Sequence, residues 1–407
     1  MGFSQALSGL NAAASSLDVQ GNNIANSQTV GFKSSSAQFA DVFANSKIGL
    51  GTRMSTVLQD FGEGNLESTG RNLDLGISGE GFFRFSQNDQ VVYSRNGQLS
   101  MTADGYLQNA QGARIMGFDA NDDGVVLAGG QPEVLQIGTE ELGAKATQNV
   151  SMVANLDSRV TDDDLNTADI GGAEVDYHFS SNFTAFDSLG NPQNTTVYFR
   201  KTPTDNQWLA KVAIGGELVP PATATDPNAG TTLQFDANGQ ITTTPASIIV
   251  EGFGPGTGAN DLDFEIDVAD FTQFGNTSRT TDLQQDGYTS GAFVGISIEA
   301  DGTIMSNFSN EQSVAAGQIA MANFRNPEGL RPEGDNAWSA TQASGQELVG
   351  APGTGLLGSI ESGAIEASNV DMARELVDMI VTQRAYQANS QTIKTQDEVL
   401  QTAINLR

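Results

Sequence analysis

The sequence predicts a multidomain protein whose all-β middle domains lie between N- and C-terminal α-helices that form a coiled-coil-like core. Three observations support this fold class. Apolar residues at both chain ends recur in alternating steps of three and four, which is the spacing of a coiled-coil seam. The sequence between them is rich in glycine and alternates apolar with polar residues, as strands do. This middle segment shows no long helical pattern of its own. The terminal helices are therefore expected to pack on each other or on further copies of the chain.

The N-terminal helix is expected over residues 1–27, and the C-terminal helix lies in the segment 366–407. Polar residues interrupt the seam of the second helix at Gln383, Ser390 and Asp397. Because polar seam positions weaken a free helix pair, this seam is expected to become stable only among many copies. The candidate assembly residues are Phe3, Leu7, Leu10, Ala14, Leu17, Ile24, Met372, Leu376, Met379, Tyr386, Ile393, Leu400 and Ile404.

The first β domain begins where Leu73, Leu75 and Ile77 alternate with other residues, a period of two that is typical of strands. Turn signals of the Asn-Gly and Asp-Gly type follow and predict short hairpins. Similar alternation returns late in the chain and is expected to complete the same domain. We therefore expect a first β domain built from residues 71–144 together with residues 287–330.

A second, more acidic β domain is expected to be inserted into the first, over residues 145–286. Its clearest strand runs from Leu262 to Val268, where apolar and polar residues alternate strictly. The segments 28–70 and 331–365 are rich in small and polar residues and have no sustained period. We therefore expect them to be linkers between the helical core and the first β domain.

Charge and composition exclude several classes of protein. The 407-residue chain carries a formal charge of -30, so a nucleic-acid backbone or an anionic membrane would repel it. It has no cysteine, which rules out disulfides and thiolate metal sites. No apolar run is long enough for membrane insertion, and the absence of any lysine before Lys33 argues against a cleaved signal peptide.

No pattern in the sequence favours an enzyme or a cofactor. His178 is the only histidine and lies in a strand pattern, so an ordinary strand residue is favoured over a catalytic base. The glycines at 353, 355 and 358 match G-x-G-x-x-G, but no strand–turn–helix pattern surrounds them, and a flexible linker is favoured over a nucleotide site.

Two acidic patterns leave weak calcium binding open. Asp119, Asn121, Asp123 and Gly124 imitate the first half of a calcium loop, but Gly130 stands where a bidentate glutamate is required. An acidic turn is therefore favoured there. A second group is expected on one strand face and favours a solvated sheet edge: Asp261, Asp263, Glu265 and Asp267.

Signatures at both chain ends resemble those of the bacterial flagellar rod and hook axial protein family. The pattern N-N-I-A-N-x-x-T-x-G-F-K runs across the end of the first helix. The last helix is preceded by E-A-S-N-V-D and contains Q-R-A-Y-Q-A-N. Two signatures at opposite ends make chance agreement remote. The residues concerned are Asn22, Asn23, Ile24, Ala25, Asn26, Thr29, Gly31, Phe32, Lys33, Ser368, Asn369, Val370, Gln383, Arg384, Ala385, Tyr386, Gln387 and Asn389.

This resemblance implies a function and a set of partners. Rod subunits of the family are shorter, and the inserted domain makes hook subunits the better match. A hook subunit would polymerise into a curved, flexible tube, a universal joint that transmits torque from rod to filament. Its partners would be copies of itself, the distal rod, the hook cap, the hook–filament junction proteins and the flagellar type III export apparatus. Its location would be extracellular, in the flagellum, after export without a cleaved signal peptide.

Two alternatives also fit the sequence. One is a distal rod subunit of the same family, which would form a straight polymer. The other is a secreted acidic β protein that binds calcium, with or without a carbohydrate-cleaving pair of carboxylates. Carboxylates are too numerous in this sequence for any one pair to be nominated.

Overall fold

The computed structural model describes residues 2–42, 49–121, 124–127, 129–221, 226 and 229–405. The chain divides into two compact units. Unit 1 comprises Met1–Thr139, Gly295–Asn307 and Ser313–Arg407, and unit 2 comprises Glu140–Val294 with Phe308–Gln312. The finer division of unit 1 into a helical core, linkers and a β domain stays a prediction.

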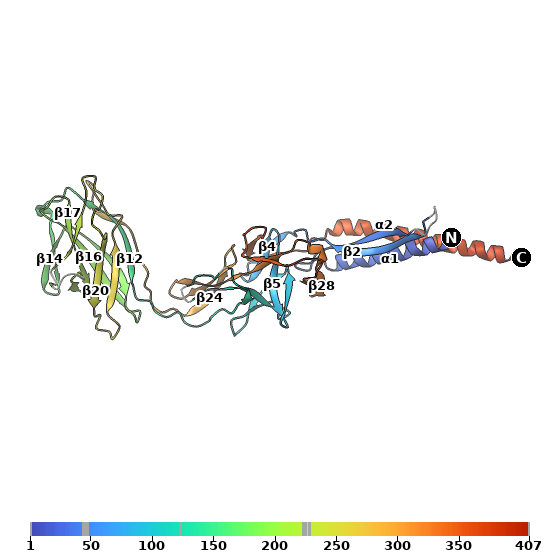
Figure 1. Cartoon of the computed structure of the whole chain (residues 1–407), viewed down its shortest axis with the longest axis horizontal. Coiled ribbons are helices and arrows are strands. Elements are labelled where there is room, and N and C mark those ends of the chain that lie inside the picture. The colour runs from blue at the N-terminus through green and yellow to red at the C-terminus, as the bar shows by residue number, and fades with distance from the viewer. Residues whose placement is uncertain are drawn as a thin grey trace. The chain divides into compact units, whose positions relative to one another are not determined.

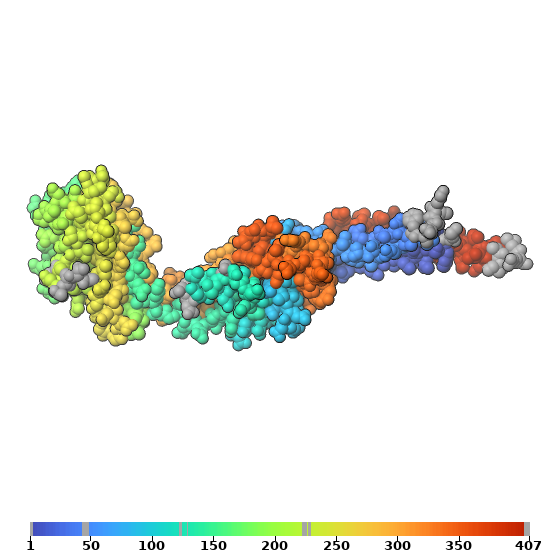
Figure 2. Space-filling model, in the orientation of Figure 1, coloured from blue at the N-terminus to red at the C-terminus, as the bar shows by residue number. Residues whose placement is uncertain are grey.

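The two long helices lie at the chain ends and belong to unit 1. Helix α1 spans Gly2–Ala25 and helix α2 spans Met372–Asn405, and the two lie side by side (Figure 1). The last turns of α2 extend beyond the start of α1 and stand clear of it (Figures 1 and 2). The predicted arrangement, a largely β middle between one N-terminal and one C-terminal helix, is confirmed. A coiled-coil-like core made with other copies stays a prediction.

The segment that follows α1 is more ordered than the expected linker. It contains an antiparallel hairpin of strands β1 (Ser35–Val42) and β2 (Gly51–Gln59), which packs along α1 (Figure 1). The hairpin escaped detection because its first strand carries mainly small and polar residues, which give a weak period of two. A two-stranded hairpin is marginal by itself, so its contact with α1 helps to stabilise it.

The rest of unit 1 is β structure. Strand β3 (Leu66–Ser68) pairs with β32 (Ala364–Glu366), and β4 (Asp74–Ser78) lies between β31 (Ser359–Ser362) and β7 (Gly97–Gln98). A larger sheet includes β24, β25, β26, β10, β5, β6, β29 and β28 in that order. Its strands are β5 Phe82–Gln87, β6 Gln90–Ser94, β8 Ser100–Met101, β9 Leu107–Gln108, β10 Arg114–Asp119, β11 Glu133–Val134, β24 Phe293–Ile298, β25 Thr303–Phe308, β26 Ser313–Ile319, β27 Met321–Asn323, β28 Arg331–Gly334, β29 Ala337–Ser339 and β30 Leu348–Gly350.

The core of unit 1 lies on these strands, with a separate aromatic cluster beside it. Leu75, Ile77 and Phe83 are fully buried, as the alternating pattern at the start of the predicted β domain requires. The aromatic cluster centres on Phe82 and Trp338, whose rings pack edge to face at 5.9 Å between centroids. A 3-10 turn, η2 (Pro327–Gly329), follows β27.

Unit 2 is a sandwich of two sheets around its own core. One sheet has the order β20-β21-β12-β22, with β23 on the other side of β12, and the other has the order β15-β16-β17-β18, with β19 also on β17. Buried residues from both sheets, including Trp208, Phe199 and Ile266, form one cluster. The strands are β12 Asn149–Asp157, β15 Phe179–Phe186, β16 Pro192–Lys201, β17 Gln207–Ile214, β18 Glu217–Val219, β19 Thr231–Gln234, β20 Ser247–Phe253, β21 Leu262–Asp267, β22 Thr272–Phe274 and β23 Arg279–Gln285. A 3-10 turn, η1 (Asp162–Asp164), and a hairpin of β13 (Asn166–Ile170) and β14 (Ala173–Tyr177) complete the unit.

The acidic strand of unit 2 is not a sheet edge, so that interpretation was wrong. Strand β21 lies between β20 and β12 and uses both of its edges for pairing. Asp263, Glu265 and Asp267 do share one solvent-exposed face, as the alternation predicted. The apolar residues of the strand point into the core, and that burial explains the position of the strand inside the sheet.

Candidate assembly surface

Helices α1 and α2 run antiparallel, and hydrogen bonds between polar side chains join them at two points. Gln20 Nε2 donates to Thr382 Oγ1 at 3.2 Å, and Asn23 Nδ2 donates to Glu375 Oε1 at 3.0 Å. Near the start of α1, a Cβ atom added to Gly9 would lie 2.8 Å from the side chain of Asn389. The start of α1 therefore lies beside the later turns of α2, and the end of α1 lies beside the start of α2. Ala6 and Ala13 are buried on α1.

This internal contact leaves much of the predicted seam uncovered. Phe3 is 49% exposed and Leu7 43%, while on α2 Leu376 is 46% and Leu400 58% exposed. Met372 and Tyr386 are also exposed, and the side chain of Ile404 lies outside the described residues. The half-buried members are Leu10, Ala14, Leu17, Ile24, Met379 and Ile393. Inside one chain, the contact face of each helix lies beside the seam and shares only some of its positions.

Sequence analysis missed further exposed apolar residues on α2. Val377 and Val381 are 60% and 61% exposed, and Ile380 and Val399 are also exposed. Val399 lies near the C-terminal end, whereas a continuous apolar face over the first turns of the helix consists of Leu376, Val377, Ile380 and Val381. Their spacing follows the i, i+4 rule, so a wider apolar stripe was detectable beside the strict seam.

The N-terminal signature closes α1 and turns the chain toward the β structure. Asn26 ends the helix, where its side-chain amide donates to the Asn22 carbonyl at 3.0 Å and its own Oδ1 accepts from Thr29 Oγ1. Gly31 then adopts φ +69°, and a Cβ atom there would lie 2.7 Å from the backbone nitrogen of Asn96. Both the backbone angle and the close contact require glycine. Phe32 is half-buried and Ala25 is exposed.

The signature lysine ends in a buried ionic cluster. Lys33 Nζ donates to Glu366 Oε1 at 2.7 Å and to the Gly62 carbonyl at 2.6 Å. Arg95 Nε donates to the second carboxylate oxygen, Glu366 Oε2, at 2.6 Å, and the Gly64 amide donates to Oε1 at 2.8 Å. The side chains of Lys33, Arg95 and Glu366 are between 0% and 4% exposed. One carboxylate therefore neutralises one of two buried cations.

The electrostatics of this cluster favour the ionised carboxylate. Burial raises the pKa of Glu366, but the Arg95 hydrogen bond and the charges of Arg95 and Lys33 outweigh it, so the pKa is lowered. Burial lowers the pKa of Lys33, and Glu366 offsets this only in part because Arg95 shares the same carboxylate. Removing the carboxylate would leave two buried cations without a counter-charge, which is a costly change.

The C-terminal signature meets the N-terminal one at this cluster. The Gly31 amide donates to the main-chain oxygen of Glu366 at 2.8 Å, and the Ser34 amide donates to Asn369 Oδ1 at 2.8 Å. Ser368 and Asp371 have the spacing of a capping box, but helix α2 begins only at Met372, so Ser368 is not its N-cap. Asp371 caps α2 itself, because its Oδ1 accepts from the amides of residues 373 and 374, while Asn369 is used for contacts with the N-terminal segment.

The remaining signature residues lie on or before α2. Val370 and Asn389 are half-buried. Gln383, Arg384, Ala385 and Gln387 are exposed, so their side chains are free of the α1 contact. The structure thus brings one part of the signature into the buried cluster and leaves the other part on the helix surface.

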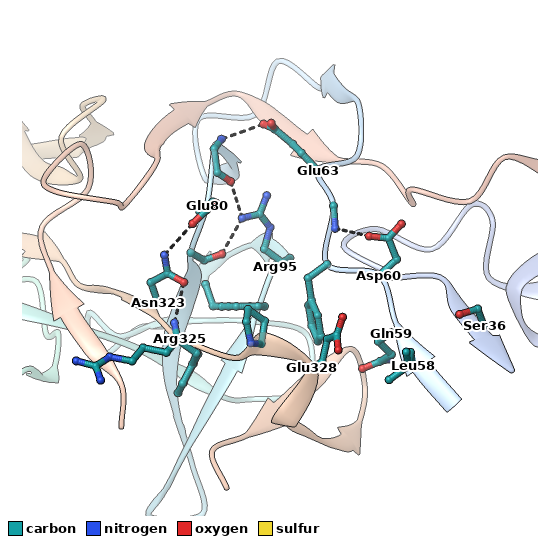
Figure 3. Close-up of a pocket in the computed structure, with 17 residues that line it drawn as sticks. Ser36, Leu58, Gln59, Asp60, Glu63, Glu80, Arg95, Asn323, Arg325 and Glu328 are labelled. Carbon is teal, nitrogen blue, oxygen red and sulfur yellow. Dashed lines mark hydrogen bonds between the residues drawn. The ribbon is translucent and has the colours of Figure 1, made fainter. Parts of the chain in front are cut away.

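A cavity of about 810 Å³ opens beside the buried cluster (Figure 3). Its walls come from the end of β2, the β4–β5 turn and the segment after β27. Glu63 Oε1 accepts from the Gly79 amide, and Glu80 Oε2 accepts from Asn323 Nδ2 (Figure 3). The Arg95 guanidinium donates to the Gly79 carbonyl at 2.9 Å. These polar groups are hydrogen-bonded to one another, so the cavity walls help to hold the buried cluster in place.

The chemical motifs noted in the sequence have structural partners. His178 Nδ1 accepts from the Lys201 amide and Nε2 lies 3.0 Å from the Thr161 carbonyl, so both ring nitrogens contact the backbone. The glycine motif is a turn between β30 and β31, closed by a bond from the Gly353 amide to the Gly358 carbonyl. In the calcium-loop-like segment, Asn121 Oδ1 accepts from the Val125 amide, and Asp123 lies outside the described residues.

Among the residues that the structure describes, no three acidic or histidine side chains gather closely enough to hold a metal ion. Neither helix, over the part that the structure describes, is long and apolar enough to cross a membrane.

Four flagellar family profiles match successive parts of the chain. A flagellar basal body rod protein profile matches residues 4–33, and a flagellar hook protein FlgE/F/G D1 domain profile matches residues 76–152. A flagellar basal body protein FlaE D2 domain profile matches residues 155–288. The C-terminal profile of the flagellar basal body rod FlgEFG proteins matches residues 361–406.

Full-length relatives and one solved structure agree with these matches. The chain is 45% identical to the flagellar hook protein FlgE of Escherichia coli over 100% of both chains, and 44% identical to that of Salmonella typhimurium, also over 100% of both. It is 33% identical to the Borreliella burgdorferi protein of the same name over 98% of each. The crystal structure of Helicobacter pylori flagellar hook protein FlgE2 shares the fold, with a TM-score of 0.52, 16% identity and coverage of 74% of this chain and 100% of that one. The chain therefore belongs to the flagellar hook protein FlgE family.

Proposed function

We propose that this chain is a structural subunit of the bacterial flagellar hook and that it polymerises through its terminal helices. The polymer would be a curved, flexible tube, a universal joint that transmits torque from rod to filament. The observation that carries this proposal is the apolar face of α2, where Leu376, Val377 and Ile380 stay exposed although α1 already packs on the neighbouring face. Contiguous exposed apolar surface of this kind marks an interaction site.

The free energy available from this face is large enough for polymerisation. Fully burying one Val, Leu or Ile side chain gains about 1.5 to 3 kcal/mol. Several such side chains are exposed on α2, with Phe3 and Leu7 on α1. Docking a subunit costs translational and rotational entropy. The free energy gained by burying the apolar face offsets this cost only when several neighbouring subunits bury the face together.

The partners and location follow from the proposed function. Its main partner is a homopolymer of many copies, and its other partners are the distal rod, the hook cap, the hook–filament junction proteins and the flagellar type III export apparatus. The site of action is extracellular, in the flagellum, after export without a cleaved signal peptide. Nucleic acid is not a partner of a chain with charge -30, and no catalytic role or cofactor is proposed.

The helix face can be tested by two polar substitutions. The double variant Leu376→Ser/Ile380→Ser should leave the thermal stability of the free chain nearly unchanged, because both side chains are exposed there. Its critical concentration for polymerisation should rise at least about tenfold, since each tenfold step corresponds to only about 1.4 kcal/mol. Gln387→Ser, an exposed polar position on the same helix, is the matched control.

Sedimentation and electron microscopy give the outcome of that test. Wild type and the control should form curved tubes with similar critical concentrations. Wild-type growth of the double variant would contradict the proposed surface, and a straight wild-type polymer would favour a distal rod subunit instead.

A further inference from the structure

A continuous set of buried contacts starts in the β structure of unit 1. Arg95 donates to the carbonyls of the β4–β5 turn and, through Nε, to the carboxylate of Glu366. Lys33 bonds to the other oxygen of that carboxylate and to the Gly62 carbonyl. Asn369 Nδ2 donates to the same Gly62 carbonyl at 3.2 Å. One carboxylate thus connects three residues that are far apart in the sequence: Lys33, Arg95 and Glu366.

The same set continues to both helices. Asn369 Oδ1 accepts from the Ser34 amide, and the next residue, Ser35, exchanges two hydrogen bonds with Asn23 of α1. Asn23 is fully buried and also donates to Glu375 of α2. The ionic cluster is therefore connected through short polar contacts to the end of α1 and the start of α2.

Glu366 is the member on which the others depend. Its carboxylate receives Lys33, Arg95 and the Gly64 amide, while its main-chain oxygen receives the Gly31 amide. Its loss would leave two buried cations facing each other, with a smaller favourable effect of the Asp60 charge on Lys33. Loss of Lys33 alone would leave Arg95 and Glu366 as a neutral pair.

We propose that Glu366 is the positioning residue of the joint between the helices and the β structure, and that its charge makes the docking of both terminal segments one cooperative step. The helices then present their assembly face only when the N-terminal segment, the C-terminal segment and Arg95 are all in place. This inference rests on the proposed function of the helices. Glu366 acts on assembly only by positioning α1 and α2. It lies between the helices and the β structure and is not part of the exposed apolar face.

Hydrogen exchange on the full-length chain tests the positioning role. In Glu366→Gln, the amides of Gly31, Ser34 and Gly64 should exchange at least about a hundredfold faster than in wild type, given the cost of unpaired buried ions. Amides of unit 2 should not change. Glu361→Gln, an exposed carboxylate on β31, is the matched control and should behave as wild type. Polymers and unassembled chains are both measured.

A second substitution separates charge balance from simple hydrogen bonding. Adding Lys33→Met to Glu366→Gln removes one of the two unpaired cations, so exchange at the three amides should slow again and the yield of polymer should recover in part. If Glu366 only supplied hydrogen bonds, the double variant would be worse than Glu366→Gln. Lys33→Met alone should have a smaller effect than Glu366→Gln, because it leaves a neutral pair.

The results have distinct meanings. Faster exchange in Glu366→Gln, together with slower exchange again in the double variant, supports the positioning role. If the Glu366→Gln chain fails to assemble, recovery of exchange and polymer yield in the double variant supports that role as well. Wild-type exchange in Glu366→Gln, or a double variant worse than the single one, overturns it. A wild-type chain that never polymerises would overturn the proposed function instead, while the exchange comparison on the unassembled chain still decides the role of Glu366.

Discussion

Gly31 illustrates how a single position can explain part of a signature. Its φ of +69° lies in the left-handed region, and the Asn96 nitrogen occupies the space that a side chain would need. Gly112 also has a positive φ, +79°, but has no neighbouring atom within 4 Å of an added Cβ. Comparing the two positions separates backbone strain from steric overlap.

Gly31→Ala should therefore destabilise unit 1 more than Gly112→Ala does. The second substitution should cost about 1 kcal/mol from backbone strain alone. The first should cost clearly more, because the Asn96 backbone must also move. Chemical denaturation measures both free energies of unfolding, and equal losses at the two positions would contradict the steric explanation.

Asp187 provides a pH-dependent test at the scale of one residue in unit 2. It is fully buried and accepts hydrogen bonds from the amides of Leu189 and Asn191 and from Thr257 Oγ1. Burial raises the pKa of Asp187, but the bonds from Asn191, Thr257 and Leu189 outweigh it, so the folded-state pKa is lowered. Its contribution to stability is therefore complete above the ordinary value of about 3.9 and is lost as pH falls through the lower folded value.

Asp187→Asn should destabilise unit 2 at pH 7 by about 1 to 3 kcal/mol, since a buried set of donors loses its charged acceptor. The difference from wild type should shrink as pH falls below about 4, where the carboxyl of the unfolded chain takes up a proton before that of the folded chain. Thermal unfolding at a series of pH values measures it. A difference that stays constant from neutral pH to acid would show that the ionised form is not favoured.

At the scale of elements, the contact between α1 and α2 depends on Asn23. Asn23→Ala would leave the backbone groups of Ser35 and the carboxylate of Glu375 without this partner. The expected cost to unit 1 is about 1 to 3 kcal/mol, measured as a free energy of unfolding. Asn22→Ala, on the exposed side of the same helix, should change it by less than about 0.5 kcal/mol. Similar losses for the two variants would argue against a specific role of the buried amide.

The helices also show what periodicity can and cannot reveal. The apolar spacing located both helices and part of their exposed face. It could not locate the internal contact, because Gln20, Asn23 and Thr382 are polar and do not contribute to an apolar period. The choice between neighbouring faces of one helix depends on which partner is present, and a single sequence carries no direct record of that partner.

The buried cluster marks a second limit of sequence reasoning. The two signatures contain both Lys33 and Glu366, but these residues lie 333 positions apart and neither pattern shows that they pair, while Arg95 belongs to neither signature. An ion pair over such a distance follows from the folded topology and cannot be read from local pattern. One signal was available, since a lysine inside an otherwise small and polar segment needs a counter-charge once it is buried.

At the scale of the whole molecule, the chain contains two units with separate cores. Within unit 2, Lys145 and Tyr288 exchange two backbone hydrogen bonds, and Leu142 and Gly291 do the same, so its two connecting segments are paired. This pairing allows most of unit 2 to be replaced by a tight turn. Apolar alternation in the sequence indicated the β character of both units, whereas the long-range pairing of strands came only from the structure.

A chain in which Asn-Gly replaces residues 146–287 should keep unit 1 folded. The paired segments then become an ordinary hairpin, for which Asn-Gly is a favoured turn. The unfolding temperature of unit 1 should shift by less than about 4 °C, which corresponds to about 1 kcal/mol. Calorimetry of the shortened and full-length chains makes the comparison. Loss of the unit 1 transition would show that its core depends on unit 2.

The most direct test of the proposed assembly is a helical reconstruction, by electron microscopy, of polymer grown from the full-length chain. It should show a curved tube whose α1 and α2 helices contact those of other copies, with Leu376, Val377 and Ile380 buried between subunits. A polymer in which these side chains face solvent, or a chain that stays monomeric under all assembly conditions, would contradict the account.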